Sequence, residues 1–538
     1  MNLRNKHGLL VDDNTDMRNS LRAQLSDCGL EHCVAVRGIR EALAKLGSTR
    51  FDLVVCDYNL GQGSDGQQFL ELIRRKKLLP LSSAFLMVTA ESGYQQVSTA
   101  AEYSPDDYLL KPFTAEKLAT RILRIFEKKE ALKPIYRHMV AKGNPLKALE
   151  ACDQLLKAGT NYPADVLRLK GELLLRCGRH DEAREFYDGV LAQRSVPWAL
   201  VGKAQAFEAL GNTSAAANTL ESTLAAYPNY LVAYDLLAGV RGKVDKKAAQ
   251  EVVEQALKVS ASTQRQRELG GLALENKDFE RAETALRAVV ERDRTGFFKS
   301  HDDYAQLSQS CVAQGKHQDA LAVVKDMGHH FQHDASLQAR QAALECQILL
   351  SAGDSSGAQE ALGRATELQK AGGLDAASSL EVAQSLFASG QNDEAKKIIQ
   401  SIAEDHHENS QVLDRALAVF DAVGMKSEGE AFLGEIHKRM IRLNNEAVAM
   451  AKQGELDKAV ASLTEAANRL RNNAQVSINA AQAILMRLSK QGMNHDQLTE
   501  AHRFITQAAA ANPEHPKLAG VVEFYRKVAP PGSLLLNV

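Results

Sequence analysis

The segment LVVCD at residues 53–57 joins a short apolar run to a single carboxylate, that of Asp57. Three other runs have the same apolar character, namely GLLV at 8–11, AFLMV at 84–88 and YLL at 108–110. Between them lie stretches with apolar residues at helical spacing, at 17–28, 39–47, 66–75 and 115–129. Short buried strands that alternate with helices are typical of a doubly wound parallel sheet. Residues 1–130 are therefore predicted to form an α/β domain.

Polar residues follow these strands at their carboxyl ends, which is the edge where sites form in sheets of this class. They are, in chain order, Asp12, Asp13, Asp57, Thr89 and Lys111. Three carboxylates converging on one crevice would repel one another, so we expect a hard divalent cation with oxygen ligands, Mg²⁺, to neutralise them. The cation and a nearby lysine would balance the charge of a phosphoryl group moving onto one carboxylate, while a hydroxyl senses the product oxygens.

The identity and order of these residues closely resemble the receiver domain of two-component response regulators, over about residues 5–128. The resemblance implies that the doubly wound sheet has five parallel strands. The resemblance implies that Asp57 is the phosphoacceptor and that Asp12, Asp13, Asp57 and the main-chain carbonyl of Asn59 hold Mg²⁺. It also implies three further roles, which are the switch hydroxyl of Thr89, the aromatic switch of Tyr108 and phosphate pairing by Lys111. Such a receiver catalyses only its own phosphoryl transfer and dephosphorylation, so the chain is not expected to be an enzyme in any other sense.

The loop after Asp57 departs from the family pattern. It reads NLGQGSDG at 59–66, which is slightly long, rich in glycine and without the usual proline. Because this loop borders the acceptor, the rate and lifetime of phosphorylation stay open. It is not a nucleotide-binding loop, since no Gly-Lys-Ser/Thr follows the glycines.

After about residue 131 the strand signals end and a short pattern recurs, in which a turn residue is followed five positions later by a small residue. The turn residues are Gly143, Gly178, Gly211, Val244, Lys277, Gly315, Gly353, Gly390, Gly424 and Gly454. The small partner is alanine in every case except Gly429, which follows Gly424. Successive turns lie 30 to 38 residues apart, and a period of that size indicates a solenoid of stacked helix pairs.

Another small residue often lies seven positions before the turn, which lets two antiparallel helices approach closely. These positions are Gly171, Ala204, Gly270, Ser308, Cys346, Ala383 and Ala447. The pattern resembles the tetratricopeptide repeat, and Pro228 matches that family's terminal proline. We therefore expect an all-α superhelical solenoid of about ten to eleven units over 131–528, with atypical last units and a tail at 529–538.

A solenoid of this type exposes a concave groove lined by the first helix of each pair and generally binds peptides or helices there. Counting from the turns, we expect six side chains to face the groove: Asp165, Arg168, Glu172, Trp198, Gln205 and Glu208. The alternative for each one is a solvated surface residue with no partner.

Composition supports a helix-rich protein, because the 538 residues are 45% hydrophobic and only 5% aromatic. No segment has the apolar length of a membrane span, and the amino terminus lacks a signal-peptide core. We therefore expect a cytoplasmic protein with no membrane partner. The net charge of −2 disfavours nucleic acid as a partner, since nucleic-acid binders normally carry a positive surface.

These features together predict a phosphorelay response regulator, phosphorylated on Asp57 by a sensor histidine kinase or phosphotransfer protein. Its output is predicted to be protein binding by the repeat groove. Two alternatives stay open. The chain could act as a phosphate sink or regulator of a kinase or phosphatase, or it could regulate transcription through an unrecognised nucleic-acid surface. The sequence names neither the kinase, the output partner, nor the regulated process.

Overall fold

A computed structural model describes residues 3–61, 65–90, 105–139, 143–294, 299–331, 334–513 and 515–530. The chain divides into two compact units, Met1–Gln314 and Gly315–Val538. Among the described residues, no helix is both long enough and apolar enough to cross a membrane.

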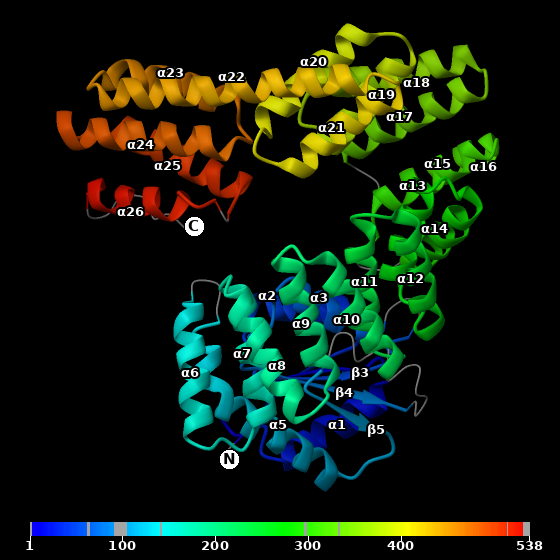
Figure 1. The fold of residues 1–538 in the computed structure, drawn as a ribbon, viewed down its shortest axis with the longest axis vertical. Coiled ribbons are helices and arrows are strands. Elements are labelled where there is room, and N and C mark those ends of the chain that lie inside the picture. Colours follow the sequence, from blue (N-terminus) through cyan, green and yellow to red (C-terminus); the bar gives the residue numbers. More distant parts are fainter. Residues whose placement is uncertain are drawn as a thin grey trace. The chain divides into compact units, whose positions relative to one another are not determined.

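Five parallel strands form one sheet in the amino-terminal unit, in the order β2-β1-β3-β4-β5. Three of these strands, β3, β4 and β5, are labelled in Figure 1. The strands are β1 His7–Val11, β2 His32–Val36, β3 Leu53–Asp57, β4 Ala84–Thr89 and β5 Asp107–Leu110. This confirms the predicted five-stranded parallel sheet, and the four predicted runs match strands to within one residue at each end. The edge strand β2 is not among those runs. Its sequence HCVAV is only partly buried, so its apolar signal is weaker.

Helices cover both faces of this sheet, namely α1 Thr15–Asp27, α2 Ile39–Ser48, α3 Gly66–Arg75 and the first turns of α5 Ala115–Tyr136. Alternate residues of a strand point to opposite faces. Leu9 of β1 therefore packs in the apolar cluster that includes Phe69 of α3, whereas Leu10 packs in the cluster that includes Leu21 of α1 and Ile122 of α5. Residues 91–104, between β4 and β5, lie outside the described residues.

Helix α5 runs further than the predicted segment 115–129 and continues through Pro134 to Tyr136. Its first half packs on the sheet through Leu118 and Ile122. Its last turns place Leu132 and Ile135 in a different apolar cluster, with residues of α6 to α9. One helix thus crosses residue 130 without a break and serves as the last helix of the α/β part and the first helix of the first repeat pair.

Helical pairs make up the rest of the chain, and no strand occurs among the described residues after β5. The amino-terminal unit contains α6 Pro145–Lys157, α7 Pro163–Arg176, α8 His180–Gln193, α9 Pro197–Ala209, α10 Thr213–Ala226, α11 Leu231–Gly242, α12 Lys246–Val259, α13 Thr263–Glu275, α14 Phe279–Asp293 and α15 His301–Ala313. The second unit contains α16 His317–His330, α17 Ala335–Ser351, α18 Ser355–Ala371, α19 Ala376–Ala388, α20 Asn392–Asp405, α21 Ser410–Ala422, α22 Lys426–Lys452, α23 Leu456–Arg469, α24 Ala474–Gln491, α25 His495–Ala511 and α26 Leu518–Val528.

The small residues of the repeat pattern lie where the helices of a pair meet. Gly178 has a φ of +71°, and Lys277, at the same place in another repeat, has a φ of +60° although it is not glycine. Ala183, five residues after the first of these turns, is fully buried. A Cβ atom added to Gly171 would lie 2.5 Å from the hydroxyl oxygen of Tyr187. Close helix contact therefore explains the choice of small residues.

The last repeats deviate from simple pairs. Helix α22 spans 27 residues between the turns at Gly424 and Gly454, so it is the second helix of one pair and the first of the next. Most of the predicted tail, residues 531–538, lies outside the described residues.

Candidate functional site

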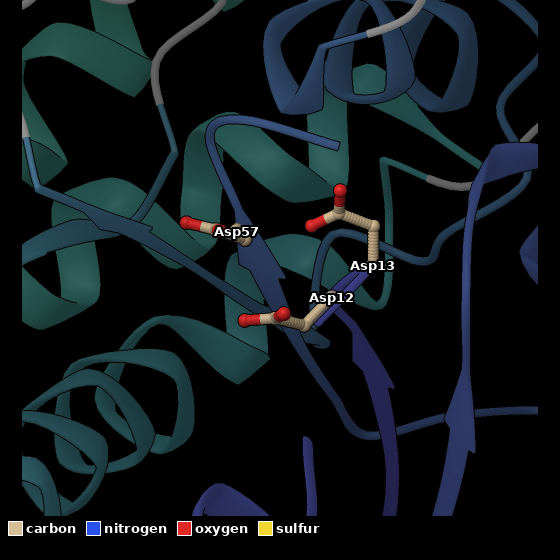
Figure 2. A group of neighbouring side chains, drawn as sticks. All are labelled: Asp12, Asp13 and Asp57. Carbon is tan, nitrogen blue, oxygen red and sulfur yellow. The ribbon is translucent and has the colours of Figure 1, made fainter. Parts of the chain in front are cut away.

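Three carboxylates meet at the carboxyl edge of the sheet (Figure 2). Asp12 and Asp13 directly follow β1, and Asp57 is the last residue of the neighbouring strand β3. Each of the three offers one oxygen, and these oxygens lie within 4.8 Å of one another. Asp12 is fully buried, Asp57 is partly buried and Asp13 is exposed. The predicted acidic residues therefore come together at one site that solvent can reach.

One lysine faces two of these carboxylates. The Lys111 Nζ atom lies 3.1 Å from Asp57 Oδ2 and 3.5 Å from Asp12 Oδ2. Lys111 follows β5, and its main-chain N–H donates to the carbonyl oxygen of Thr89 at 2.7 Å, which fixes it beside the end of β4. The other oxygen of Asp12 accepts the main-chain N–H of Asn14 at 2.9 Å.

Sequence reasoning missed a second cation at this edge, Arg18 of α1. Its guanidinium donates to the main-chain carbonyl of Asp12 at 2.8 Å and to that of Asp13 at 3.0 Å. These bonds hold the backbone of the two acidic residues and do not involve their carboxylates. The spacing from Asp13 to Arg18 is one helical turn plus a cap, a signal too common to identify the contact from sequence.

Burial raises the pKa of Asp57 above its ordinary value, and the charge of Asp12 adds to that rise, while Lys111 opposes it. Within the described residues, the cluster contains three carboxylates and one lysine that faces them. When all of these groups are ionised, the cluster therefore has a net negative charge. Hard oxygen donors in this arrangement are the ligands that Mg²⁺ takes in proteins. Asn59 lies two residues after Asp57 in an exposed loop, and its side-chain oxygen accepts the N–H of Gly61 at 3.4 Å.

Two glycines of the β3–α3 loop lie against the acidic residues. Gly61 has a φ of +81°, and a Cβ atom there would lie 2.8 Å from Asp13 Oδ2. A Cβ atom at Gly66 would lie 2.3 Å from the carbonyl oxygen of Asp57, closer than such atoms can approach. The positive φ of Gly61 and the close approach at Gly66 thus account for glycine at these two positions of the loop. Residues 62–64 lie outside the described residues.

The sequence matches the response regulator receiver domain family over residues 9–123 and tetratricopeptide repeat families over 137–196 and 198–230. The chemotaxis protein CheY of Pseudomonas aeruginosa is 37% identical over 123 residues, which are 22% of this chain and 95% of that protein. The chain belongs to the response regulator receiver family. Its receiver is followed by tetratricopeptide repeats.

Two Vibrio cholerae proteins are also similar to the receiver. Chemotaxis protein CheY-3 is 36% identical over 123 residues, which are 91% of its length. The solved structure of the chemotaxis response regulator CheY4 is 28% identical, with a TM-score of 0.21, and the match covers 22% of this chain and 98% of that one.

The receiver's two predicted switch residues lie on adjacent strands. Thr89 ends β4 and is buried, with 5% of the residue's surface exposed. Tyr108 lies in β5, and its ring packs against the apolar cluster on the α2 and α3 face together with Tyr58. Its hydroxyl is buried without a hydrogen-bond partner among the described residues. Burial and the nearby Tyr58 raise the pKa of Tyr108. The ring therefore points inward.

The six side chains predicted to face the repeat groove lie on α7 and α9, the first helices of their pairs. Several contact other residues of the chain. Asp165 forms an ion pair with Lys128 of α5, and Glu208 forms one with Lys243 at 2.7 Å. The remaining contacts are the pair of Arg168 with Glu172 at 3.2 Å and the edge-on packing of Trp198 against Tyr187, with ring centroids 6.2 Å apart. Partner binding by these residues remains a prediction.

Proposed function

We propose that this chain is a phosphorelay response regulator in which a sensor histidine kinase or a phosphotransfer protein phosphorylates Asp57. The observation that carries this proposal is the carboxylate cluster with Lys111 3.1 Å from the Asp57 carboxylate. A phosphoryl group on Asp57 would lie within reach of this lysine. We also propose that the protein works in the cytoplasm, where such kinases present their phosphohistidine.

The chemistry is a transfer between two protein side chains. An Asp57 carboxylate oxygen forms a bond to phosphorus as the phosphorus–nitrogen bond of the donor phosphohistidine breaks, and the imidazole released takes up a proton. The residues that would hold Mg²⁺ are Asp12, Asp13, Asp57 and the Asn59 main-chain carbonyl; when bound, the ion neutralises charge on the transferring group. Lys111 would pair with the phosphoryl oxygens, since its Nζ atom lies 3.1 Å from the Asp57 carboxylate. Attack of water on phosphorus later restores the carboxylate and releases inorganic phosphate.

The signal would leave the site through Thr89 and Tyr108. The Thr89 hydroxyl moves toward the phosphoryl oxygens, and the Tyr108 ring moves with it because β4 and β5 are adjacent. The buried hydroxyl of Tyr108 has no hydrogen-bond partner within the described part of the chain, and this favours such a movement, since an unsatisfied polar group in an apolar cluster is costly. Phosphorylation thereby changes the surface formed by β5 and α5.

Helix α5 would carry this change to the repeats. Lys128 of α5 is paired with Asp165 of α7, and Lys129 of α5 binds Asp106, just before β5, at 2.7 Å. Two consecutive lysines thus hold α5 to a repeat helix and to the receiver. The output is then a change in the affinity of the repeat groove for a protein partner, because Asp165, which is predicted to line the groove, forms an ion pair with α5.

The phosphorylation step is tested by incubation with radiolabelled acetyl phosphate and MgCl₂. Wild type should take up label and Asp57→Asn should take up none, because an amide oxygen is too weak a nucleophile. Asp52→Asn is the matched control, since Asp52 adjoins the opposite end of the same strand, where it binds Lys6 at 2.7 Å, and this variant should be labelled normally. Stoichiometric label on Asp57→Asn would contradict the assignment.

The output step is tested with Thr89→Ala, after a partner has been captured by the phosphorylated protein. This variant should still be labelled on Asp57 but should lose the phosphorylation-dependent change in partner affinity, measured by titration calorimetry. A typical coupling free energy is about 1–3 kcal/mol, or about 5–150-fold in affinity. If wild type and Thr89→Ala bind the partner identically with and without phosphate, the receiver does not control the groove.

A further inference from the structure

An arginine of the repeats reaches the loop beside the phosphorylation site. Arg292 lies near the end of α14, and its Nη2 atom is 3.8 Å from Oδ2 of Asp65. Asp65 immediately precedes α3 and closes the loop that follows β3. The two residues are 227 positions apart in sequence, and both belong to the amino-terminal compact unit.

Asp65 is tied to Asp57 through short backbone contacts. Its Oδ1 atom accepts the N–H of Gln68 at 2.7 Å and caps α3, and its Oδ2 atom faces Arg292. The next residue, Gly66, donates its N–H to the carbonyl oxygen of Tyr58 at 2.7 Å and packs against the carbonyl of Asp57. A displacement of Asp65 is therefore transmitted to the residues around the acceptor.

Arg292 is held on the repeat side by its other terminal nitrogen. Its Nη1 atom donates to the carbonyl oxygen of Ala261 at 3.0 Å, in the connection between α12 and α13. The guanidinium thus spans from the repeat backbone to the receiver loop. The side chains of Arg292 and Asp65 are 47% and 26% exposed, so the contact is accessible to water and its strength depends on salt.

The charge of Asp65 belongs to the same acidic region as the acceptor. Burial raises the pKa of Asp65, and Arg292 opposes that rise. The charges of Asp57, Asp12 and Asp65 all act on the Cys56 thiol and add to the rise in its pKa caused by burial. Arg292 therefore offsets one of the negative charges near which a phosphoryl dianion would form.

We propose that Arg292, contributed by the repeats, is a positioning residue for phosphoryl transfer to Asp57 and that its contact with Asp65 couples phosphorylation to the seating of α14 on the receiver loop. This rests on the proposed phosphorylation of Asp57. Linkage makes the coupling reciprocal: if the contact favours phosphorylation, then phosphorylation strengthens the contact by the same factor. A partner that pulls α14 away would lower the phosphorylated fraction.

The test measures steady-state labelling of the full chain by acetyl phosphate with saturating MgCl₂ at low ionic strength. Arg292→Gln should lower the labelled fraction about two- to fivefold, the range set by a partly exposed ion pair. Arg292→Lys should restore most of the loss, because it keeps the charge. Arg281→Gln is the matched control: Arg281 lies on the same helix and pairs with Glu254 at 3.2 Å, so its loss should leave labelling unchanged.

A double-mutant cycle assigns the effect to the pair. Asp65→Asn keeps an N-cap side chain and removes the charge, so it should raise labelling, and Arg292→Gln should have no further effect in that background. The inference is wrong if wild type is labelled but Arg292→Gln is labelled equally well, or if Arg292→Gln has the same effect with Asn at position 65. If wild type takes no label at all, the proposed phosphorylation itself fails and this inference fails with it.

Discussion

The receiver and the repeats of this chain assemble their functional surfaces in opposite ways. The receiver brings Asp12, Asp57 and Lys111 together from the ends of different strands, and Asp12 and Lys111 are 99 positions apart in sequence. Its site therefore depends on the whole sheet. In the repeats, close contacts such as that between Gly171 and Tyr187 join helices that are neighbours in sequence. A substitution that disturbs the receiver sheet is therefore expected to disturb the whole phosphorylation site. A substitution in one repeat is expected to disturb only the neighbouring helices.

Helix α5 belongs to both regions, because it packs in the core of the receiver and in the core of the first repeats. Ile122 is buried on the receiver sheet and Ile135 is buried in the first repeats, and the two lie on one continuous helix. A fragment cut at residue 130 would keep only residues 131–136 of this helix, too few to form a helix unaided. The two regions are thus distinct in architecture but share an element.

The largest effect is expected from Ile135→Ala, which should cost about 2–5 kcal/mol because it leaves a cavity in a fully buried site. Hydrogen exchange should speed up most in α6 and α7 and little in β1 to β4. Ile122→Ala is the matched change on the receiver side and should show the reverse distribution. Equal acceleration of both regions by each variant would show that α5 makes them a single cooperative unit.

Gly66→Ala should have the next largest effect, about 1–3 kcal/mol, because the added methyl meets a backbone carbonyl that cannot move aside easily. It should also reduce labelling of Asp57 severalfold, because the loop is displaced from the acceptor. Gly47→Ala is the control: Gly47 lies within α2 with nothing within 4 Å of the added methyl, so this variant should be slightly more stable than wild type. Normal stability and labelling of Gly66→Ala would show that the loop does not depend on this close contact.

The sequence alone predicted most of the receiver because its signals are strong and local. Apolar runs and the polar residue after each one indicated the strands and the site edge, and Asp12, Asp13 and Asp57 do meet there. The partly buried edge strand β2 was missed, since partial exposure weakens an apolar pattern. The turn pattern likewise predicted the helix pairs, including the turn at Lys277, whose left-handed conformation the structure shows.

Contacts between distant segments could not be predicted in this way. Nothing in the sequence near Arg292 indicates that it faces Asp65, because charged residues at helix ends are common and either one alone is an ordinary surface residue. The extension of α5 past residue 129 was hidden by Pro134, which usually marks the end of a helix. Tertiary packing, which sequence patterns do not reveal, decided both cases.

The smallest effect concerns a buried charge in the repeats, and it tests whether such charges there resemble those of the receiver. Asp405 ends α20; burial and the neighbouring Glu404 raise its pKa from 3.8 to about 6, and its Oδ1 atom has no partner among the described residues. A carboxylate at a helix carboxyl terminus also opposes the helix dipole.

Because the folded-state pKa is raised, the stability contributed by protonated Asp405 is fully present below about pH 4 and is lost as pH rises through about 6. Asp405→Asn should therefore match wild type near pH 4 and exceed it by about 1–2 kcal/mol at pH 8 in urea unfolding followed by circular dichroism. Asp421→Asn, which removes an exposed carboxylate near the end of α21, controls for the loss of charge at a helix end. A constant difference between Asp405→Asn and wild type across this pH range would mean that Asp405 is ionised as easily in the repeats as in the unfolded chain.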